Sequence, residues 1–359
     1  MAPRKPLKEV LAEFTMPAAP QLVLSEEDGT LRCVACGHRC RIKEGSAGIC
    51  MFRFNRNGVL RVPAGYVAGL NVDPIEKKPL YHVLPGQDAL SFGMLGCNFH
   101  CPFCQNWVSS QVLRDDNAVA YPRETDADSL VQAALSRGAP IIVSTYNEPL
   151  ITADWAAQIF DKAHEKGLKC GFVTNGHASP EVLAFLEGRL EMASVDLKCF
   201  TQTGYATLGG VLKNVLDSIS RLKEMGVWIE VVTLVVPGFN DSATELRGIA
   251  DFVVSVSPEV PWHVTAFHPD YTMTDGGPTP LSKLNEAHTI GKEAGLHYVY
   301  QGNIAGGDFE HTYCHSCNAL LIRRRGFYVL ENRMRGGNCP DCGAAAPGIW
   351  EDAPPHQST

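Results

Sequence analysis

Short apolar runs alternate with helix-like apolar spacing through the middle of the chain. The runs are rich in β-branched residues and cover residues 141–143, 171–173, 192–195, 228–235, 263–267 and 297–300. They recur about every 22–36 residues, which is the length of a strand, a crossover helix and their connections. This spacing predicts parallel strands joined by helices between residues 89 and 303.

Helical patterns fill the intervals between the apolar runs. Thr125 and Asp128 resemble a capping box ahead of one helix, and Ser179 directly before a proline is a typical cap of another. Apolar residues recur at helical spacing over 151–159 and 211–222. This order of elements favours an α/β fold built as a full or partial β/α barrel, with a doubly wound open sheet as the alternative.

Composition and charge narrow the class of protein. The chain has 359 residues, of which 45% are hydrophobic and 19% charged, so it can bury a sizeable core. Its net charge of −8 makes nucleic acid an unexpected partner. No apolar run approaches the roughly 18 residues that span a membrane, and residues 1–14 lack the pattern of a signal peptide. We therefore predict a cytoplasmic protein.

Thirteen cysteines are many for such a chain, and clustered cysteines in a reducing compartment indicate metals rather than disulfides. Eleven of them form three groups: Cys33, Cys36, Cys40 and Cys50; Cys97, Cys101 and Cys104; and Cys314, Cys317, Cys339 and Cys342. Only Cys170 and Cys199 remain. The grouping predicts three metal sites.

The cysteine groups and shifts in composition suggest a division of the chain. We predict an N-terminal cysteine-rich metal-binding segment over 1–60, a β/α barrel over 61–308, a C-terminal zinc-ribbon-like module over 309–350, and a disordered tail over 351–359.

The central group has the spacing Cys97-x3-Cys101-x2-Cys104 directly after the first predicted barrel strand. Three thiolates on a [4Fe–4S] cluster leave one iron open, and an open iron can bind S-adenosylmethionine (SAM). An electron passed into SAM can break a C–S bond and release a 5′-deoxyadenosyl radical. The alternative is a zinc site of three cysteines with a histidine such as His100.

These residues resemble the radical SAM superfamily, and within it the glycyl-radical-enzyme activases such as pyruvate formate-lyase activating enzyme. The similarity covers about residues 90–303, and each shared motif follows a predicted strand. The motifs are Phe103 beside the last cysteine, Tyr146-Asn147-Glu148-Pro149, Thr174-Asn175-Gly176, Asp196-Leu197-Lys198 and Phe267-His268.

The resemblance implies the residues that bind the cofactors. They are Phe103, Asn147, Glu148, Asn175, Asp196, Lys198 and His268, with Lys198 as the partner of the SAM carboxylate. The sequence departs from the family at two places. Tyr146 and Asn147 stand where it has glycines, and Val173 stands where the activases have an aspartate for a monovalent cation.

The whole chain looks most similar to the radical SAM proteins of the AmmeMemoRadiSam three-component system. The stretches 33–40, 73–82, 298–303 and 347–350 carry this match. The resemblance implies a link to the other two proteins of that system. Radical SAM chemistry also implies an external one-electron donor such as a flavodoxin or ferredoxin.

The flanking groups each supply four thiolates. Cys314-x2-Cys317 and Cys339-x2-Cys342 form two knuckles, which suit tetrahedral zinc. For Cys33, Cys36, Cys40 and Cys50, zinc and a second [4Fe–4S] cluster both fit. The Cys36-Gly37 knuckle favours zinc, and His38 is an alternative ligand.

The sequence thus predicts a radical SAM enzyme, an oxidoreductase that abstracts hydrogen from an unidentified substrate and that activates a partner protein if it follows the activases. A non-catalytic metal-binding adaptor, or an electron-transfer protein of a multi-component system, is the alternative.

Overall fold

The computed structural model describes residues 5–304 and 306–350, so the predicted disordered tail lies outside the described residues. An eight-stranded sheet forms the centre, in the order β16-β15-β14-β13-β12-β11-β9-β8. Its strands are β8 (Gly69–Pro74), β9 (Asp88–Gly93), β11 (Ile141–Ser144), β12 (Lys169–Thr174), β13 (Met192–Asp196), β14 (Trp228–Val235), β15 (Trp262–Ala266) and β16 (Val299–Gly302).

All pairings from β9 to β16 are parallel, which confirms the predicted α/β fold with a mostly parallel sheet. Strand β8 was not predicted, and it pairs antiparallel with β9. The strands follow one another in chain order, without the reversal of a doubly wound sheet, and β8 and β16 are its two ends, so within the described residues the sheet is open and not a closed barrel.

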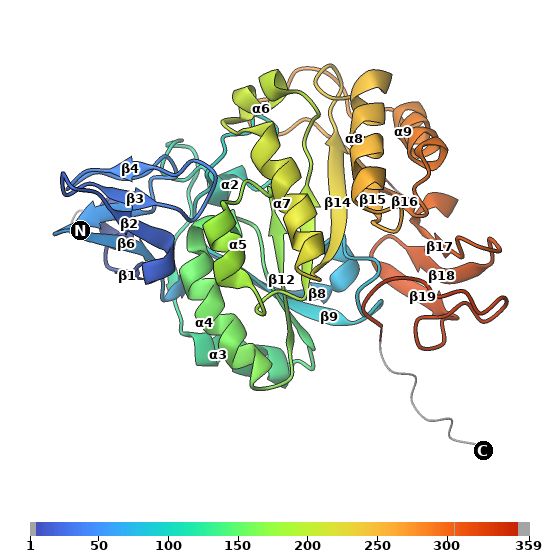
Figure 1. Cartoon of the computed structure of the whole chain (residues 1–359), viewed down its shortest axis with the longest axis horizontal. Helices are drawn as coiled ribbons and strands as arrows, with labels where there is room; N and C mark the ends of the chain where they lie inside the picture. Colours follow the sequence, from blue (N-terminus) through green and yellow to red (C-terminus); the bar gives the residue numbers. More distant parts are fainter. Residues whose placement is uncertain (1–4, 305, 351–359) are drawn as a thin grey trace.

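Helices cover the outer face of this sheet (Figure 1). Strands β11 and β15 are buried along their whole length, which explains why they are continuous apolar runs instead of alternating patterns. The helices are α2 (Trp107–Ser110), α3 (Ala127–Ser136), α4 (Ala153–His164), α5 (Pro180–Leu186), α6 (Gln202–Leu208), α7 (Leu212–Glu224), α8 (Ala243–Val256) and α9 (Leu281–Ala294), with a 3-10 turn η3 at Pro149–Thr152.

Two predicted helix starts had different outcomes. Ser179 caps α5 as predicted, because its hydroxyl accepts from the N–H of Val182 at 3.1 Å. The predicted cap Thr125 is wrong: Asp126 caps α3 and accepts from Ser129 N–H at 2.7 Å. Thr125 instead donates its backbone N–H to Gly65, which holds it beside the short strand β10 (Arg123–Glu124).

The N-terminal region forms two small antiparallel sheets, of order β1-β6-β5 and β2-β3-β4. The first extends past residue 60, the predicted boundary. The elements are α1 (Leu7–Leu11), β1 (Thr15–Pro17), η1 (Pro20–Leu22), β2 (Val23–Ser25), β3 (Leu31–Cys33), β4 (Arg41–Ile42), β5 (Phe54–Arg56) and β6 (Val59–Pro63). Strand β7 (Tyr66–Val67) follows and pairs with β10. The 3-10 turn η2 (Ile75–Lys77) comes after β8.

The C-terminal region forms a third antiparallel sheet, β17 (Thr312–Tyr313), β18 (Leu320–Arg325) and β19 (Tyr328–Asn332), after η4 (Asp308–Glu310). Figure 1 shows this sheet and the N-terminal strands at opposite ends of the central body. The predicted two-strand pattern around 320–322 and 327–330 corresponds to β18 and β19.

A buried carboxylate ties the base of the central sheet to the C-terminal region. Glu230 on β14 accepts from the backbone N–H groups of Tyr81 and His82 at 3.0 and 2.8 Å, and lies 2.6 Å from Nε2 of His263. His82 in turn contacts the carbonyl of Pro347 through Nδ1 at 2.7 Å. The C-terminal module is therefore held by hydrogen bonds to the barrel base.

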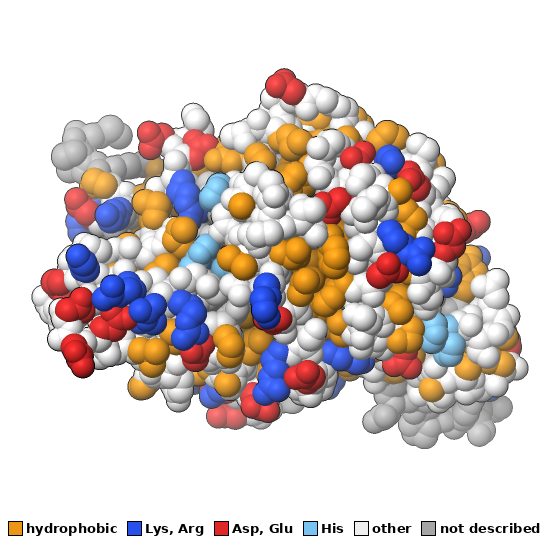
Figure 2. Space-filling view, turned by 45° about the horizontal axis from the view of Figure 1, so that its top comes forward, with side chains coloured by type: hydrophobic (Ala, Val, Ile, Leu, Met, Phe, Trp, Pro, Cys, Tyr) orange, Lys and Arg blue, Asp and Glu red, His pale blue; other side chains and the backbone are white. Residues whose placement is uncertain are grey.

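Basic and acidic side chains are interspersed on the face drawn in Figure 2, without one dominant sign. Within the described ranges, every helix is too short or too polar to cross a lipid bilayer.

Candidate active site and metal centres

The loop after β9 carries the three central cysteines. Gly96 opens it with φ of 96°, a conformation that glycine adopts without strain. Gly93 lets two loops approach, because a Cβ there would lie 2.6 Å from the carbonyl oxygen of Thr145. Cys101 is buried, whereas Cys97 and Cys104 are partly exposed. All three line one cavity of about 110 Å³ at the carboxyl ends of the strands.

The surroundings of these sulfur atoms suit thiolates bound to a metal cluster. Cys97 Sγ accepts from the N–H of Phe99 at 3.3 Å, and Cys104 Sγ lies 3.2 Å from the hydroxyl of Ser110. Burial raises the pKa of Cys101 to about 12, although the ammonium of Lys198 lowers it. Without a positively charged metal, the thiol would stay protonated at neutral pH.

The spacing of the sulfur atoms argues against the zinc alternative. Among the described residues, His100 and the three cysteines form no group of three or more ligand atoms lying within 4.8 Å of one another. His100 is exposed and packs against Gly209. Thiolates on separate irons of a cubane are necessarily farther apart than thiolates on a single ion, so this donor set fits a cluster.

Glu148 lies buried beside the cysteine loop. Its Oε1 accepts from the Thr174 hydroxyl at 2.6 Å, and its Oε2 from the N–H of Asn175 at 2.8 Å. Burial raises the pKa of Glu148 to about 7, against the lowering effect of the hydrogen bonds from Thr174, Asn175 and Leu150. A carboxyl group that titrates near neutral pH is typical of a functional site.

Three asparagines form hydrogen bonds among the loops that follow β9, β11 and β12. Asn175 donates from Nδ2 to Asn98 Oδ1 at 2.7 Å and lies 3.8 Å from Cys97 Sγ. Asn147 accepts from Met94 N–H at 2.9 Å and donates to the carbonyl of Glu148, so its side chain braces the backbone. Asn98 Nδ2 is buried and has no partner among the described residues.

Asp196 and Lys198 form an ion pair at the end of β13, with Lys198 Nζ 2.8 Å from Asp196 Oδ2. Burial opposes the charge on Lys198, but Asp196 and the Cys101 thiolate outweigh it and raise the pKa of the lysine. The backbone is fixed as well, because Lys198 N–H donates to the Tyr205 hydroxyl at 3.1 Å. Lys198 therefore stays a fixed cation beside the cysteine loop.

A second cavity of about 410 Å³ adjoins the first, and both are lined by Cys101, Cys104, Asp196 and Lys198. Phe103 is buried, lines the larger cavity and packs against Phe239 with ring centroids 5.5 Å apart. His268 differs from the other predicted residues, since it is exposed, lines neither cavity and contacts Gln105 at 3.0 Å.

Two residues of the larger cavity were not predicted as site residues. Lys78 Nζ donates to the Tyr146 hydroxyl at 3.3 Å and to Asp73 Oδ2 at 3.4 Å. Tyr146 has φ of 69°, so it adopts the left-handed backbone where the family has glycine. That departure in the sequence was the only signal for Tyr146. Lys78 lies in the stretch 73–82, which carries the family resemblance but gave no role to any single residue.

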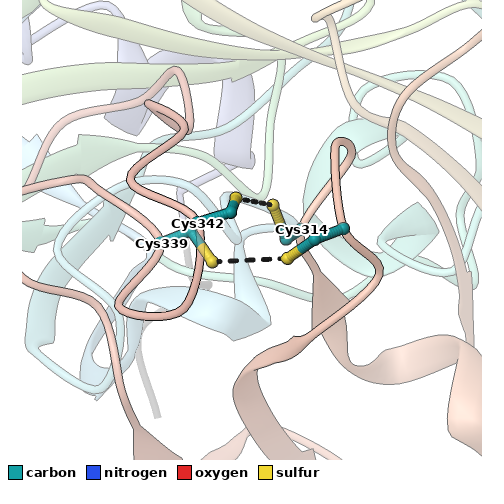
Figure 3. A group of neighbouring side chains, drawn as sticks. Cys314, Cys339 and Cys342 are labelled. Atoms are coloured by element: carbon teal, nitrogen blue, oxygen red, sulfur yellow. Dashed lines mark hydrogen bonds between the residues drawn. The ribbon is translucent and has the colours of Figure 1, made fainter.

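The four C-terminal cysteines converge on one point. All four sulfur atoms lie within 4.8 Å of one another. In Figure 3, Cys314 comes from one loop and Cys339 and Cys342 from the facing loop, with their sulfur atoms turned toward each other. The pairs Cys314–Cys342 and Cys317–Cys339 lie 3.6 and 3.7 Å apart. Tetrahedral zinc at about 2.3 Å from each sulfur needs such a spacing.

Comparison with known proteins agrees with this site. The model of the radical SAM superfamily matches residues 93–252, which include the cysteine loop, so this part of the chain is a radical SAM superfamily domain. An uncharacterized protein of Methanocaldococcus jannaschii is 38% identical over 321 residues, which are 88% of this chain and 95% of the relative.

Solved radical SAM structures are similar at lower identity. A domain of pyruvate-formate lyase-activating enzyme from Bacteroides vulgatus is 20% identical, with a TM-score of 0.39, over 45% of this chain and 98% of that one. A radical SAM methyltransferase from Sphaerobacter thermophilus is 14% identical, with a TM-score of 0.46, over 89% of this chain and 86% of that one.

Proposed function

We propose that this chain is an enzyme that cleaves SAM reductively at a [4Fe–4S] cluster held by Cys97, Cys101 and Cys104, and then takes a hydrogen atom from a substrate. The observation that supports it is a cavity lined by the three cysteines, Glu148, Asn175 and Lys198, which follow the carboxyl ends of the neighbouring strands β9, β11, β12 and β13. Active sites of β/α barrels lie at this edge.

The cluster, when bound, would pass one electron from an external donor into SAM, breaking a C–S bond to give methionine and a 5′-deoxyadenosyl radical that removes one hydrogen atom. The chain's own residues hold and orient these groups. Lys198 offers a fixed cation to the SAM carboxylate, and the Glu148 carboxylate offers an acceptor for its amino group. Buried Phe103 shields the cluster loop from water.

Anaerobic reconstitution tests this function. Wild-type protein given iron, sulfide, dithionite and SAM should produce 5′-deoxyadenosine and methionine. Its electron paramagnetic resonance (EPR) signal should change when SAM is added. A protein that holds iron but yields no 5′-deoxyadenosine and shows no response to SAM would instead be an adaptor or electron carrier.

Binding of SAM should depend on pH through Glu148. Its pKa of about 7 means that the carboxyl group is protonated below that pH. Because only the carboxylate attracts the cationic amino group, we expect the Kd for SAM to rise as the pH falls below 7, by up to about tenfold per pH unit. Calorimetric titration of reconstituted protein between pH 6 and 8 measures this.

Glu148→Gln is the matched variant, since it keeps the shape but removes the titration. For this variant we expect weak binding of SAM at both pH 6 and pH 8, with a Kd that does not change between them. A wild-type Kd that stays constant from pH 6 to 8 would show that Glu148 does not carry the effect.

The partners of this enzyme follow from the sequence resemblance. We infer that a flavodoxin or ferredoxin supplies the electron, and that the two other AmmeMemoRadiSam proteins act with this chain. Activation of a partner protein, as by the glycyl-radical activases, is the subtype we propose. Incubation of reduced enzyme and SAM with each purified partner, followed by EPR detection of a protein radical, would test it.

We propose zinc for the C-terminal cysteine site, because its four sulfur atoms lie within 4.8 Å of one another, close enough for one tetrahedral ion. Cys339→Ser should lower the zinc content by one ion per chain and increase hydrogen exchange across residues 309–350, since the small module has little core of its own. Iron content should stay unchanged. Unaltered zinc content in this variant would contradict the assignment.

A further inference from the structure

The N-terminal module gathers its four cysteines on one side. Cys33 ends β3, and its N–H donates to the carbonyl of Cys40 at 2.9 Å, just before β4. Cys36 lies in the turn between these strands, and Cys50 lies in a second turn, which the N–H of Met51 closes on the carbonyl of Gly48. Cys33, Cys36 and Cys50 are buried and Cys40 is half-buried, so the group is largely shielded from solvent.

A backbone donor points at one of these sulfur atoms. Ile49 N–H donates to Cys40 Sγ at 3.4 Å. Sulfur is a weak acceptor as a thiol and a stronger one as a thiolate, so this donor suits anionic, metal-bound sulfur.

A buried arginine supplies an independent observation. Arg53 is 1% exposed and donates from Nη1 to Asp154 Oδ2 at 2.7 Å. Its Nε and Nη2 are buried without any hydrogen-bond partner in the described structure. Arg53 follows Cys50 by three residues, and its backbone carbonyl accepts from the N–H of Gly48 at 2.8 Å. Unsatisfied buried donors cost about 1–3 kcal/mol each, and the sulfur atoms of a bound cluster are acceptors that would remove this cost.

The spacing distinguishes a cluster from zinc. Four thiolates at about 2.3 Å from one zinc ion lie about 3.8 Å apart, as the C-terminal cysteines do. Among the residues that the structure describes, no three of the N-terminal cysteines bring their sulfur atoms within 4.8 Å of one another. They share this wider spacing with Cys97, Cys101 and Cys104. The Nε2 atom of His38 lies 3.0 Å from the carbonyl oxygen of Asn98.

From these observations we propose that Cys33, Cys36, Cys40 and Cys50 bind a second [4Fe–4S] cluster, with one thiolate on each iron. No iron of this cluster is open, so it cannot bind SAM in the way that the central site does. The inference extends the proposed function without depending on it. The sequence expectation for this set of cysteines was zinc, because of the Cys36-Gly37 knuckle. The structure leads us to propose the cluster instead.

The test leaves the N-terminal module intact. Full-length Cys101→Ala/Cys104→Ala protein, reconstituted anaerobically with iron and sulfide, should hold about four irons and about four sulfides, against about eight of each in wild type. Its dithionite-reduced EPR spectrum should show a cubane that does not respond to SAM. Two zinc ions and no iron would overturn the proposal, as would about one iron without sulfide.

The reciprocal variant is Cys36→Ser/Cys40→Ser. It should keep about four irons and the EPR signal that SAM alters. Retention of about eight irons would overturn the proposal. The two proposals fail separately: wild type with about eight irons but no response to SAM would contradict SAM cleavage and leave the second cluster standing.

Discussion

Cys101→Ala is expected to abolish formation of 5′-deoxyadenosine from SAM. Cys101 is the buried member of the three central cysteines, and the Lys198 ammonium lowers its pKa against the effect of burial. Without its thiolate the cluster keeps two ligands. Mutation of a residue that only hydrogen-bonds to a metal ligand typically lowers activity about 10–100-fold. Because Cys101 is itself a ligand, we expect the rate of 5′-deoxyadenosine formation to fall by more than about a hundredfold.

The matched control is Cys170→Ala. Cys170 is equally buried but lies near the start of β12, at the opposite end of the strand from the site. This variant should keep the iron content, the SAM-altered EPR signal and the rate of 5′-deoxyadenosine release. Chromatography of both variants after anaerobic incubation with dithionite and SAM gives the comparison. Wild-type turnover by Cys101→Ala would contradict the proposed ligand set.

Glu230→Ala is expected to destabilise the whole chain by about 3–5 kcal/mol, the range for a broken buried charge network. Burial alone would raise the pKa of Glu230, but the hydrogen bond and charge of His263 and the charge and N–H of His82 outweigh it and lower the pKa. Tyr81 N–H donates to the same carboxylate at 3.0 Å. The substitution leaves these donors buried without an acceptor. Denaturant unfolding of the variant and wild type at pH 7.5 measures the difference.

The same network should make the protein sensitive to acid. The pKa of Glu230 is lowered on folding, so its contribution is present above the unfolded carboxyl value of 4.5 and is lost as the pH falls through the folded value. Burial lowers the pKa of His82 to about 4 from 6.5, so stability also falls as the pH drops from 6.5 toward 4. Glu187→Ala, at an exposed position, should change neither stability nor its pH dependence.

Sequence periodicity predicted the parallel strands well, because strands covered on both faces are continuous apolar runs. It missed β8, whose burial pattern is mostly intermediate and which pairs antiparallel at the sheet edge. It misplaced one cap, because both Thr125 and Asp126 are capping residues, and only the pairing of Thr125 with Gly65 decides between them. Local patterns do not contain that long-range hydrogen bond.

In the candidate site, too, the sequence predicted some residues and missed others. The positions of Cys97, Glu148, Asn175 and Lys198 follow from the rule that parallel strands end at one edge, and the structure brings them to one cavity. His268 follows the same rule, yet its side chain is exposed beside Gln105 and lines neither cavity. Lys78 reaches the larger cavity from a loop before β9 that no periodic pattern describes.

The sequence by itself determined the donor chemistry: three cysteines in a short loop, two sets of four thiolates, and polar motifs after successive apolar strands. These properties depend on residue type and spacing along the chain. Only the tertiary structure decided how far apart the sulfur atoms of each set lie and that Arg53 is buried beside the N-terminal set with two free donors. The distance between side chains on different turns depends on how those turns pack, and packing is a property of the folded chain.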